Sequence, residues 1–148
     1  MTNTLKIAIY KARFTGELAH WAIHVNVEGI DMIYEVIGGD GEPFEYDDKQ
    51  TSPARSGSYS ISIAVPNNIP KSLDEMREIL QATKINNSDR SYKCQKRVLE
   101  GLKDLNRNGA ITSTEYMNAV GQVNHLMSQK SIKDELSSLT VGYAYEPY

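Results

Sequence analysis

"HWAIHVNVEGIDMIYEVIG", residues 20–38, is the stretch that decides the fold. Apolar residues alternate with others on both sides of Gly29, which is typical of two half-buried strands joined by a short turn. We therefore predict that Trp21–Val27 and Met32–Ile37 pair antiparallel as a hairpin. Successive side chains of a strand point to opposite faces, so His20 and His24 are expected on the same face.

Two more stretches on either side of this hairpin have the composition of strands. They are "LKIAIYKAR" at 5–13 and "YSISIAV" at 59–65, so residues 5–66 are expected to form mainly strands. Residues 38–58, "GGDGEPFEYDDKQTSPARSGS", are rich in Gly, Asp, Ser and Pro. This composition predicts a long irregular connection, which is either the flank of a binding cleft or a surface loop.

After Pro70 the spacing of apolar residues becomes helical. A helix is predicted from Ser72, where Ser72 and Glu75 have the spacing of a capping box, and further helices from near Ser91 and from about Ser113. Residues 72–136 are therefore expected to be mainly helical. The prediction for 1–148 is one α+β domain, in which an antiparallel sheet of about four or five strands packs against three helices.

Charge and composition exclude several classes of protein. The 148 residues carry 16 basic and 19 acidic side chains, a net charge of −3, and no long basic run, so we expect no nucleic-acid partner. The single cysteine cannot form an intrachain disulfide, and no apolar run is long enough to cross a bilayer. Without a secretory signal at the N-terminus, the expected location is cytoplasmic. The oligomeric state stays open.

A calcium-binding motif follows the predicted second helix. Asp104, Asn106, Asn108, Gly109 and Glu115 match the EF-hand pattern D-x-[DN]-x-[DN]-G-x5-E. Calcium prefers six to eight oxygen ligands, and this loop offers only two carboxylates, so any binding should be weak.

The same letters have an explanation without a metal. Asn108-Gly109 can end one helix in a left-handed cap, while Thr112 and Glu115 form a capping box for the next. Ile111 would then pack on Tyr116 as a hydrophobic staple. The segment is accordingly either a helix–turn–helix joint or a weak calcium site.

Cys94 has two interpretations as well. If its helix begins at Ser91, the thiol lies in the first turn, where the helix dipole, Lys93 and Arg97 favour a reactive thiolate. Alternatively, Cys94 is a small buried hydrophobic residue in line with Val98.

An imidazole close to this helix would favour the reactive interpretation. His20, at the start of a strand, can take the thiol proton, as histidine does in thiol enzymes. Glu35 is a carboxylate in an otherwise apolar strand next to it, and orienting an imidazole would explain its presence. The alternative is an edge strand with Glu35 in water.

The combination of "HWAIHV…IYEVIG" with a later "YKCQKRVLEGL" resembles the circularly permuted papain-like thiol enzymes. This group includes lecithin:retinol acyltransferase and its phospholipid-acyltransferase relatives, the PPPDE peptidases and small fungal proteins of unassigned role. In it, a histidine strand precedes the cysteine helix. The resemblance implies that Cys94 is the nucleophile, His20 its base and Glu35 the nearest equivalent of the orienting group. It also leads us to expect Trp21, His24 and Gln95 at the substrate site.

We therefore expect a thiol-dependent hydrolase or acyl transferase. Its substrate would be a soluble amide, ester or thioester, either a small molecule or a peptide, and no cofactor is expected. A small-metabolite conversion in the same cleft is a related alternative. The other class is a non-catalytic calcium-binding or protein-interaction module that uses the loop at 104–115.

Overall fold

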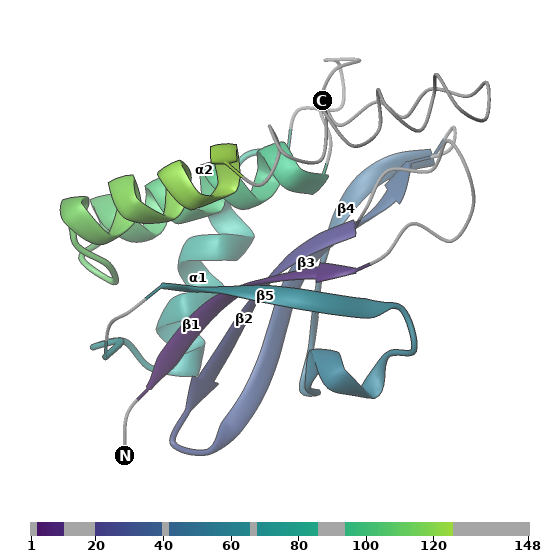
Figure 1. Cartoon of the computed structure of the whole chain (residues 1–148), viewed down its shortest axis with the longest axis horizontal. Coiled ribbons are helices and arrows are strands. Elements are labelled where there is room, and N and C mark those ends of the chain that lie inside the picture. The colour runs from purple at the N-terminus through teal and green to yellow at the C-terminus, as the bar shows by residue number, and fades with distance from the viewer. Residues whose placement is uncertain (1–2, 11–19, 40–41, 66–67, 86–93, 126–148) are drawn as a thin grey trace.

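A computed structural model describes residues 3–10, 20–39, 42–65, 68–85 and 94–125 of the chain. Of Gly38, Gly39, Glu42, Cys94 and Gln95 it describes the backbone alone. The described part is an antiparallel sheet with helices packed on one of its faces (Figure 1). The predicted α+β class is confirmed.

The sheet has five strands in the order β4-β3-β2-β1-β5, and every neighbouring pair is antiparallel. β4 and β5 therefore form its two edges. The strands are β1 (Thr4–Tyr10), β2 (His20–Val27), β3 (Ile30–Gly39), β4 (Glu42–Lys49) and β5 (Tyr59–Val65).

The predicted hairpin is formed by β2 and β3. Val27 pairs with Ile30, so the turn consists of Glu28 and Gly29, whose φ angles are 53° and 81°. Two successive positive φ angles are typical of the tight turns whose twist matches that of the strands. Gly29 adopts its angle without the steric cost that Glu28 bears.

The prediction of an irregular connection over 38–58 is wrong for β4. Tyr46 pairs with Val36 of β3, and Asp47 pairs with Glu35. Because β4 contains acidic residues and Pro43, its sequence does not resemble a strand. Both kinds of residue are nevertheless well tolerated at a sheet edge. The rest of the connection contains one short 3-10 helix, η1 (Pro53–Arg55).

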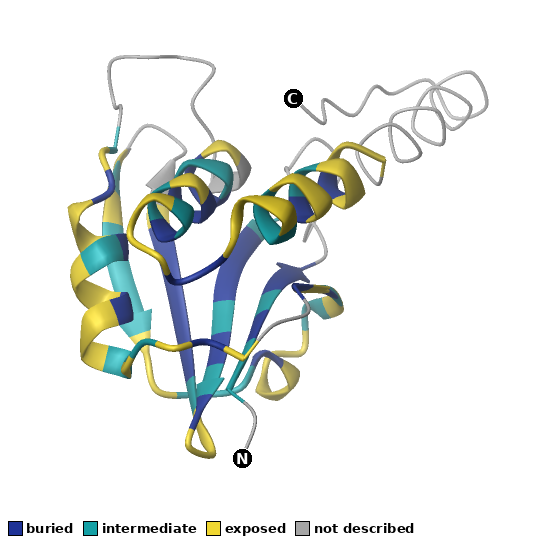
Figure 2. Ribbon diagram, turned by 90° about the vertical axis from the view of Figure 1, so that its left-hand side faces the viewer, coloured by how far each residue is buried: buried dark blue, intermediate teal, exposed yellow. Residues whose placement is uncertain are grey.

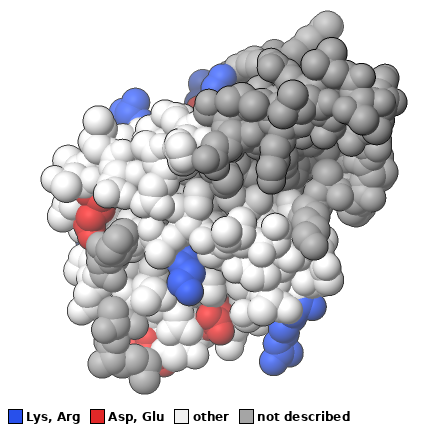
Figure 3. All heavy atoms as spheres, in the orientation of Figure 1, with Lys and Arg blue, Asp and Glu red and all other residues white. Residues whose placement is uncertain are grey.

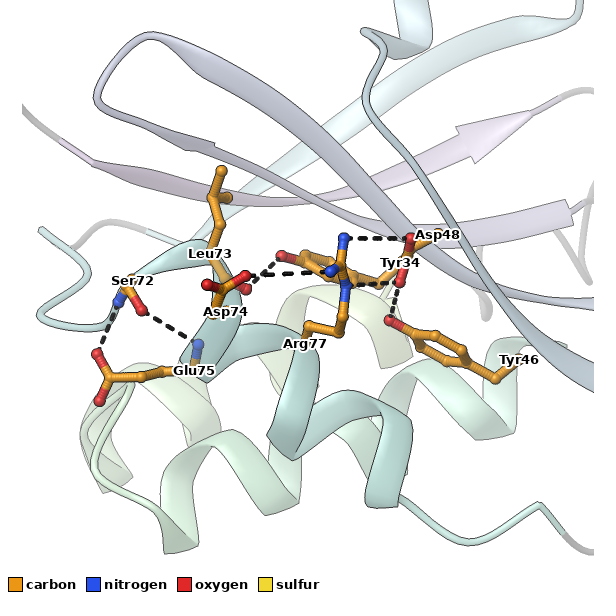
Figure 4. Close-up of polar contacts among 8 residues, drawn as sticks. All are labelled: Tyr34, Tyr46, Asp48, Ser72, Leu73, Asp74, Glu75 and Arg77. Carbon is orange, nitrogen blue, oxygen red and sulfur yellow. Dashed lines mark hydrogen bonds and ion pairs between the residues drawn. The ribbon is translucent and has the colours of Figure 1, made fainter.

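Three helices cover one face of the sheet (Figure 2). The first, α1 (Leu73–Ala82), begins with the predicted capping box: the Ser72 amide donates to Glu75 Oε1 at 3.0 Å, and the Glu75 amide donates to Ser72 Oγ at 3.1 Å (Figure 4). α2 spans Cys94–Arg107, and a third helix is described over 113–125. Among the described residues, no helix is both long and apolar enough to cross a membrane.

Polar contacts join α1 to β3 and β4 (Figure 4). Arg77 Nε donates to Asp48 Oδ2 at 3.0 Å, and the Tyr46 hydroxyl donates to the same oxygen at 2.6 Å. The Tyr34 hydroxyl donates to the Leu73 carbonyl at 3.1 Å. These bonds hold α1 over β3 and over β4, the edge strand that was not predicted from the sequence.

The main core lies between the sheet and the helices. Its largest fully buried side chains come from both layers. Gly101 lets α2 pack tightly against β2 and α1, since a Cβ there would lie 3.1 Å from both Ile23 Cδ1 and Leu80 Cδ2. The buried set includes Leu5, Ile7, Val25, Met76, Leu80, Leu102, Leu105 and Val123.

Candidate functional site

The face of the sheet opposite the helices carries the polar side chains that the sequence singles out. Trp21 and Ile23 belong to the main core, so the alternation along β2 places His20 and His24 on the other face. A second, small cluster of buried residues lies there as well, consisting of Ala8, Tyr10, Ala22 and Ile33. We call this side the polar face.

His20, Glu35 and Lys49 form a chain of contacts on the polar face. The Nε2 atom of His20 lies 2.5 Å from Glu35 Oε1, and Lys49 Nζ lies 3.0 Å from Glu35 Oε2. The Glu35 side chain is 6% exposed, against 35% for His20 and 53% for Lys49. The alternative of a solvated Glu35 is wrong, because both of its oxygens are paired and the side chain is buried.

His20 and Lys49 keep Glu35 ionised. Burial alone would raise the pKa of Glu35, but the hydrogen bonds and charges of His20 and Lys49 outweigh it and hold that pKa below its ordinary value of 4.5. In return, the hydrogen bond to Glu35 and its charge raise the pKa of Lys49 above 10.5. The carboxylate is therefore negative at neutral pH.

Tyr10 packs against the histidine ring. The ring centroids of Tyr10 and His20 are 5.4 Å apart, and Tyr59 lies edge-on to Tyr10 with centroids 6.0 Å apart. Burial, together with the charges of Glu35 and Tyr59, raises the pKa of Tyr10 to about 12. The phenol is neutral at pH 7, and its ring packs beside the imidazole of His20.

His24 forms a separate pair further along β2. Its Nε2 atom lies 2.7 Å from Asp31 Oδ1, and Asn26 Nδ2 donates to the same oxygen at 3.1 Å. Burial would raise the pKa of Asp31, but the hydrogen bonds of Asn26 and His24 and the charges of His24 and Lys6 hold it below 3.8. His24 thus shares the polar face with His20 but has a carboxylate of its own.

The remaining predicted site residues lie elsewhere. The Trp21 side chain is 4% exposed in the main core, on the face opposite the His20 ring. α2 is described from Cys94 onward and packs on that same helical face, and its predicted start near Ser91 lies outside the described residues. The side chains of Cys94 and Gln95 are outside the described residues, so the pairing of Cys94 with His20 stays a prediction.

The segment 104–115 forms the predicted joint. α2 continues through Asp104 to Arg107, and Gly109, with φ of 80°, follows its end. The Ala110 amide then donates to the Leu105 carbonyl at 2.8 Å, which closes the helix in a Schellman-type cap. Ile111 is buried in the main core, and Tyr116 packs against that core.

The next helix starts with the predicted capping box. The Thr112 amide donates to Glu115 Oε1 at 2.7 Å, and the Glu115 amide donates to Thr112 Oγ1 at 3.1 Å. Asp104 pairs with Arg107 at 3.3 Å, and Asn106 Nδ2 donates to the Ile111 carbonyl at 3.1 Å. No group of three or more His, Cys, Asp or Glu side chains suited to a metal occurs in the part of the chain that is described. Calcium binding by Asp104, Asn106, Asn108 and Glu115 stays a prediction.

Sequence reasoning missed Lys49 and Tyr10. Lys49 belongs to β4, which the patterns do not predict, and Tyr10 reaches His20 because the two residues pair across β1 and β2. The alternation of "TLKIAIY" could have placed Tyr10 on the polar face, whereas the sequence gives no sign of the β3–β4 register.

No protein-family model, no curated protein and no solved structure shows significant similarity to the chain. The resemblance to permuted papain-like enzymes therefore rests on the sequence motifs alone.

Proposed function

We propose that the chain is a thiol-dependent hydrolase or acyl transferase. In this proposal Cys94 is the nucleophile, His20 is its base and Glu35 orients His20. The observation that carries it is the contact of 2.5 Å between His20 Nε2 and the buried carboxylate of Glu35. A buried carboxylate bound to an imidazole at the start of a strand is the support that a catalytic base requires.

The carboxylate determines which nitrogen can act. When Nε2 donates its hydrogen to Glu35, the imidazole lone pair is on Nδ1. The charge of Glu35 stabilises the imidazolium that forms once Nδ1 accepts a proton. With 35% of its side chain exposed, His20 is accessible to a substrate on the polar face.

The proposed reaction is acyl transfer through a thioester. His20 accepts the Cys94 proton while the sulfur forms a bond to the carbonyl carbon of an amide, ester or thioester. The tetrahedral intermediate then collapses, and the leaving group departs with the proton from His20. Water or an acceptor, deprotonated by His20, attacks the acyl group, and the sulfur leaves and takes that proton back from His20. Backbone amides at the start of α2 would stabilise the oxyanion.

This mechanism sets a spatial requirement. α2 packs on the face of the sheet opposite the His20 ring, so the sulfur has to reach the ring around the beginning of β2. The test must therefore measure whether the two groups influence one another.

The experiment is the rate of Cys94 alkylation by iodoacetamide as a function of pH. The parent, His20→Ala and His24→Ala are compared, because the two histidines lie on the same strand and the same face, and each contacts a different carboxylate. We expect a thiol pKa well below about 8.5 in the parent, a return toward that value in His20→Ala and no change in His24→Ala.

Two controls accompany this comparison. Far-ultraviolet circular dichroism and urea unfolding establish that each variant is folded, and Cys94→Ser establishes that the measured alkylation occurs at Cys94. A parent thiol that titrates near about 8.5 and does not respond to His20→Ala would contradict the proposal.

A further inference from the structure

We propose that β5 is a self-association edge: two copies of the chain pair their β5 strands antiparallel and join their sheets into one of ten strands. This inference is independent of the proposed function. It rests on the hydrogen bonding, exposure and composition of Tyr59–Val65.

The outer edge of β5 has no partner strand in the described part of the chain. β1 is the strand with which β5 pairs, from Leu5↔Val65 to Tyr10↔Tyr59, and no described strand lies on its other side. Alternate amide and carbonyl groups of an edge strand point outward and need water or another strand as a partner. Ser60, Ile61 and Ala64 are exposed, so this strand is partly accessible to solvent.

The composition of β5 lacks the charged residues and the proline that usually protect an edge. "YSISIAV" contains no charged residue and no proline, and four of its seven residues are Tyr, Ile or Val. A bulge between Ile9 and Tyr10 disturbs the pairing at the Tyr59 end, but the register from Ile61 to Val65 is regular. Uncharged segments of high β-propensity at an edge readily pair with another chain.

β4, the opposite edge strand, does carry residues that protect an edge from pairing with another chain. β4, "EPFEYDDK", carries four acidic residues, one lysine and a proline. Two copies of β4 would bring like charges together, in a chain whose net charge is already −3. The surface over β5, by contrast, consists mainly of atoms that are neither acidic nor basic (Figure 3). The two edges therefore differ in charge: like charges oppose the pairing of two β4 strands, whereas two β5 strands carry no charge that would oppose it.

A second copy fits this edge because the strand is self-complementary. Antiparallel pairing about a two-fold axis at Ser62 would place Ile61 opposite Ile63 of the partner. Ile61 pairs with Ile9 of the main core, so it lies on the helical side, yet it is 54% exposed. Pairing would bury both copies of Ile61 together. Because the contact is a single short strand, the dimer should depend on protein concentration.

The test is sedimentation velocity over a wide range of concentration, with the parent, Ile61→Lys and Met117→Lys. Both substitutions add a lysine at an exposed apolar residue, since Met117 is 67% exposed on the third helix. We expect a monomer–dimer equilibrium in the parent and in Met117→Lys, and a dissociation constant raised at least tenfold in Ile61→Lys.

Hydrogen exchange locates the contact in the same samples. The outward-facing amides of Ser60–Ala64 should exchange fast in dilute protein and slow down as the dimer forms. A parent that is monomeric at all concentrations, or a dimer that Ile61→Lys leaves unchanged, would overturn the proposal. Protection of these amides that is independent of concentration would overturn it too, because it would show that the chain covers its own edge.

Discussion

The carboxylate of Glu35 is shared between His20 and Lys49, with Oε1 2.5 Å from the imidazole and Oε2 3.0 Å from the ammonium group. The acidic side chain is 6% exposed, and both of its partners are more exposed than it is. A buried charge of this kind is tolerated only when its oxygens are paired. The three residues come from three adjacent strands, so the contact also depends on the register of the sheet.

Removing the charge of Glu35 should destabilise the fold. Glu35→Gln keeps the shape of the side chain but leaves a neutral amide beside the imidazole of His20 and the ammonium group of Lys49, and we expect a loss of about 1–3 kcal/mol in the free energy of unfolding. The measurement is urea unfolding at pH 7. Asp31→Asn is the matched control: the Asp31 side chain, bound to His24, is 35% exposed, so its loss should stay below about 1 kcal/mol. Equal losses in the two variants would contradict the role of burial.

Stability should fall in acid through the same carboxylate. The pKa of Glu35 is lower in the fold than its ordinary value of 4.5, so the folded protein binds a proton less readily than the unfolded chain. The stabilisation is therefore complete above about pH 5 and is lost as the pH falls from there through the folded-state pKa. Urea midpoints at a series of pH values should decline less steeply in Glu35→Gln. Parallel curves would show that other carboxylates, such as Asp31, account for the acid sensitivity.

The packing of α2 on the sheet can be tested at Gly101. A methyl group there would meet Ile23 Cδ1 and Leu80 Cδ2 at 3.1 Å, and both side chains are almost fully buried. Gly101→Ala should therefore cost about 1 kcal/mol, because overpacking outweighs the better helix propensity of alanine. Ile23→Val removes one of the two close atoms, so the double variant should be more stable than the sum of the single effects predicts. Additive effects would contradict a direct clash.

The hairpin could be predicted from the sequence because its determinants are local. Alternating apolar residues and Gly29 lie within one short stretch, as do the capping residues Ser72 and Glu75. β4 could not be predicted in the same way. Its acidic residues and Pro43 resemble a loop, and the strand forms because β3 offers it a hydrogen-bonding edge.

In the candidate site, too, the contacts with local determinants could be predicted and those that depend on long-range pairing could not. A lone carboxylate in an apolar strand predicted that Glu35 needs a partner, and the hairpin placed His20 within reach. Lys49 depends on the β3–β4 register, and Tyr10 on the pairing of β1 with β2, so both require tertiary structure. The position of the Cys94 helix on one face or the other is likewise decided by packing, which strand alternation alone does not give.

The capping box at Thr112 separates the structural joint from a calcium site. Thr112→Ala removes the acceptor of the Glu115 amide and should cost about 1 kcal/mol, equally in calcium and in chelator, because the bond involves no metal. Urea unfolding under both conditions measures this. Calorimetric titration with calcium is the complementary experiment: saturable binding that Asp104→Ala and Glu115→Ala abolish would support the calcium module instead.

Gly109 and Gly121 form a matched pair for the geometry of the same joint. A Cβ at either position would have no heavy atom within 4 Å, so steric clashes do not distinguish them. Gly109 has a φ of 80°, where an L-residue is strained, whereas Gly121 lies within the third helix. Gly109→Ala should therefore lose about 1–2 kcal/mol, while Gly121→Ala should gain up to about 1 kcal/mol from helix propensity. Urea unfolding of both variants decides the point, and changes of the same sign would show that the left-handed cap does not govern the end of α2.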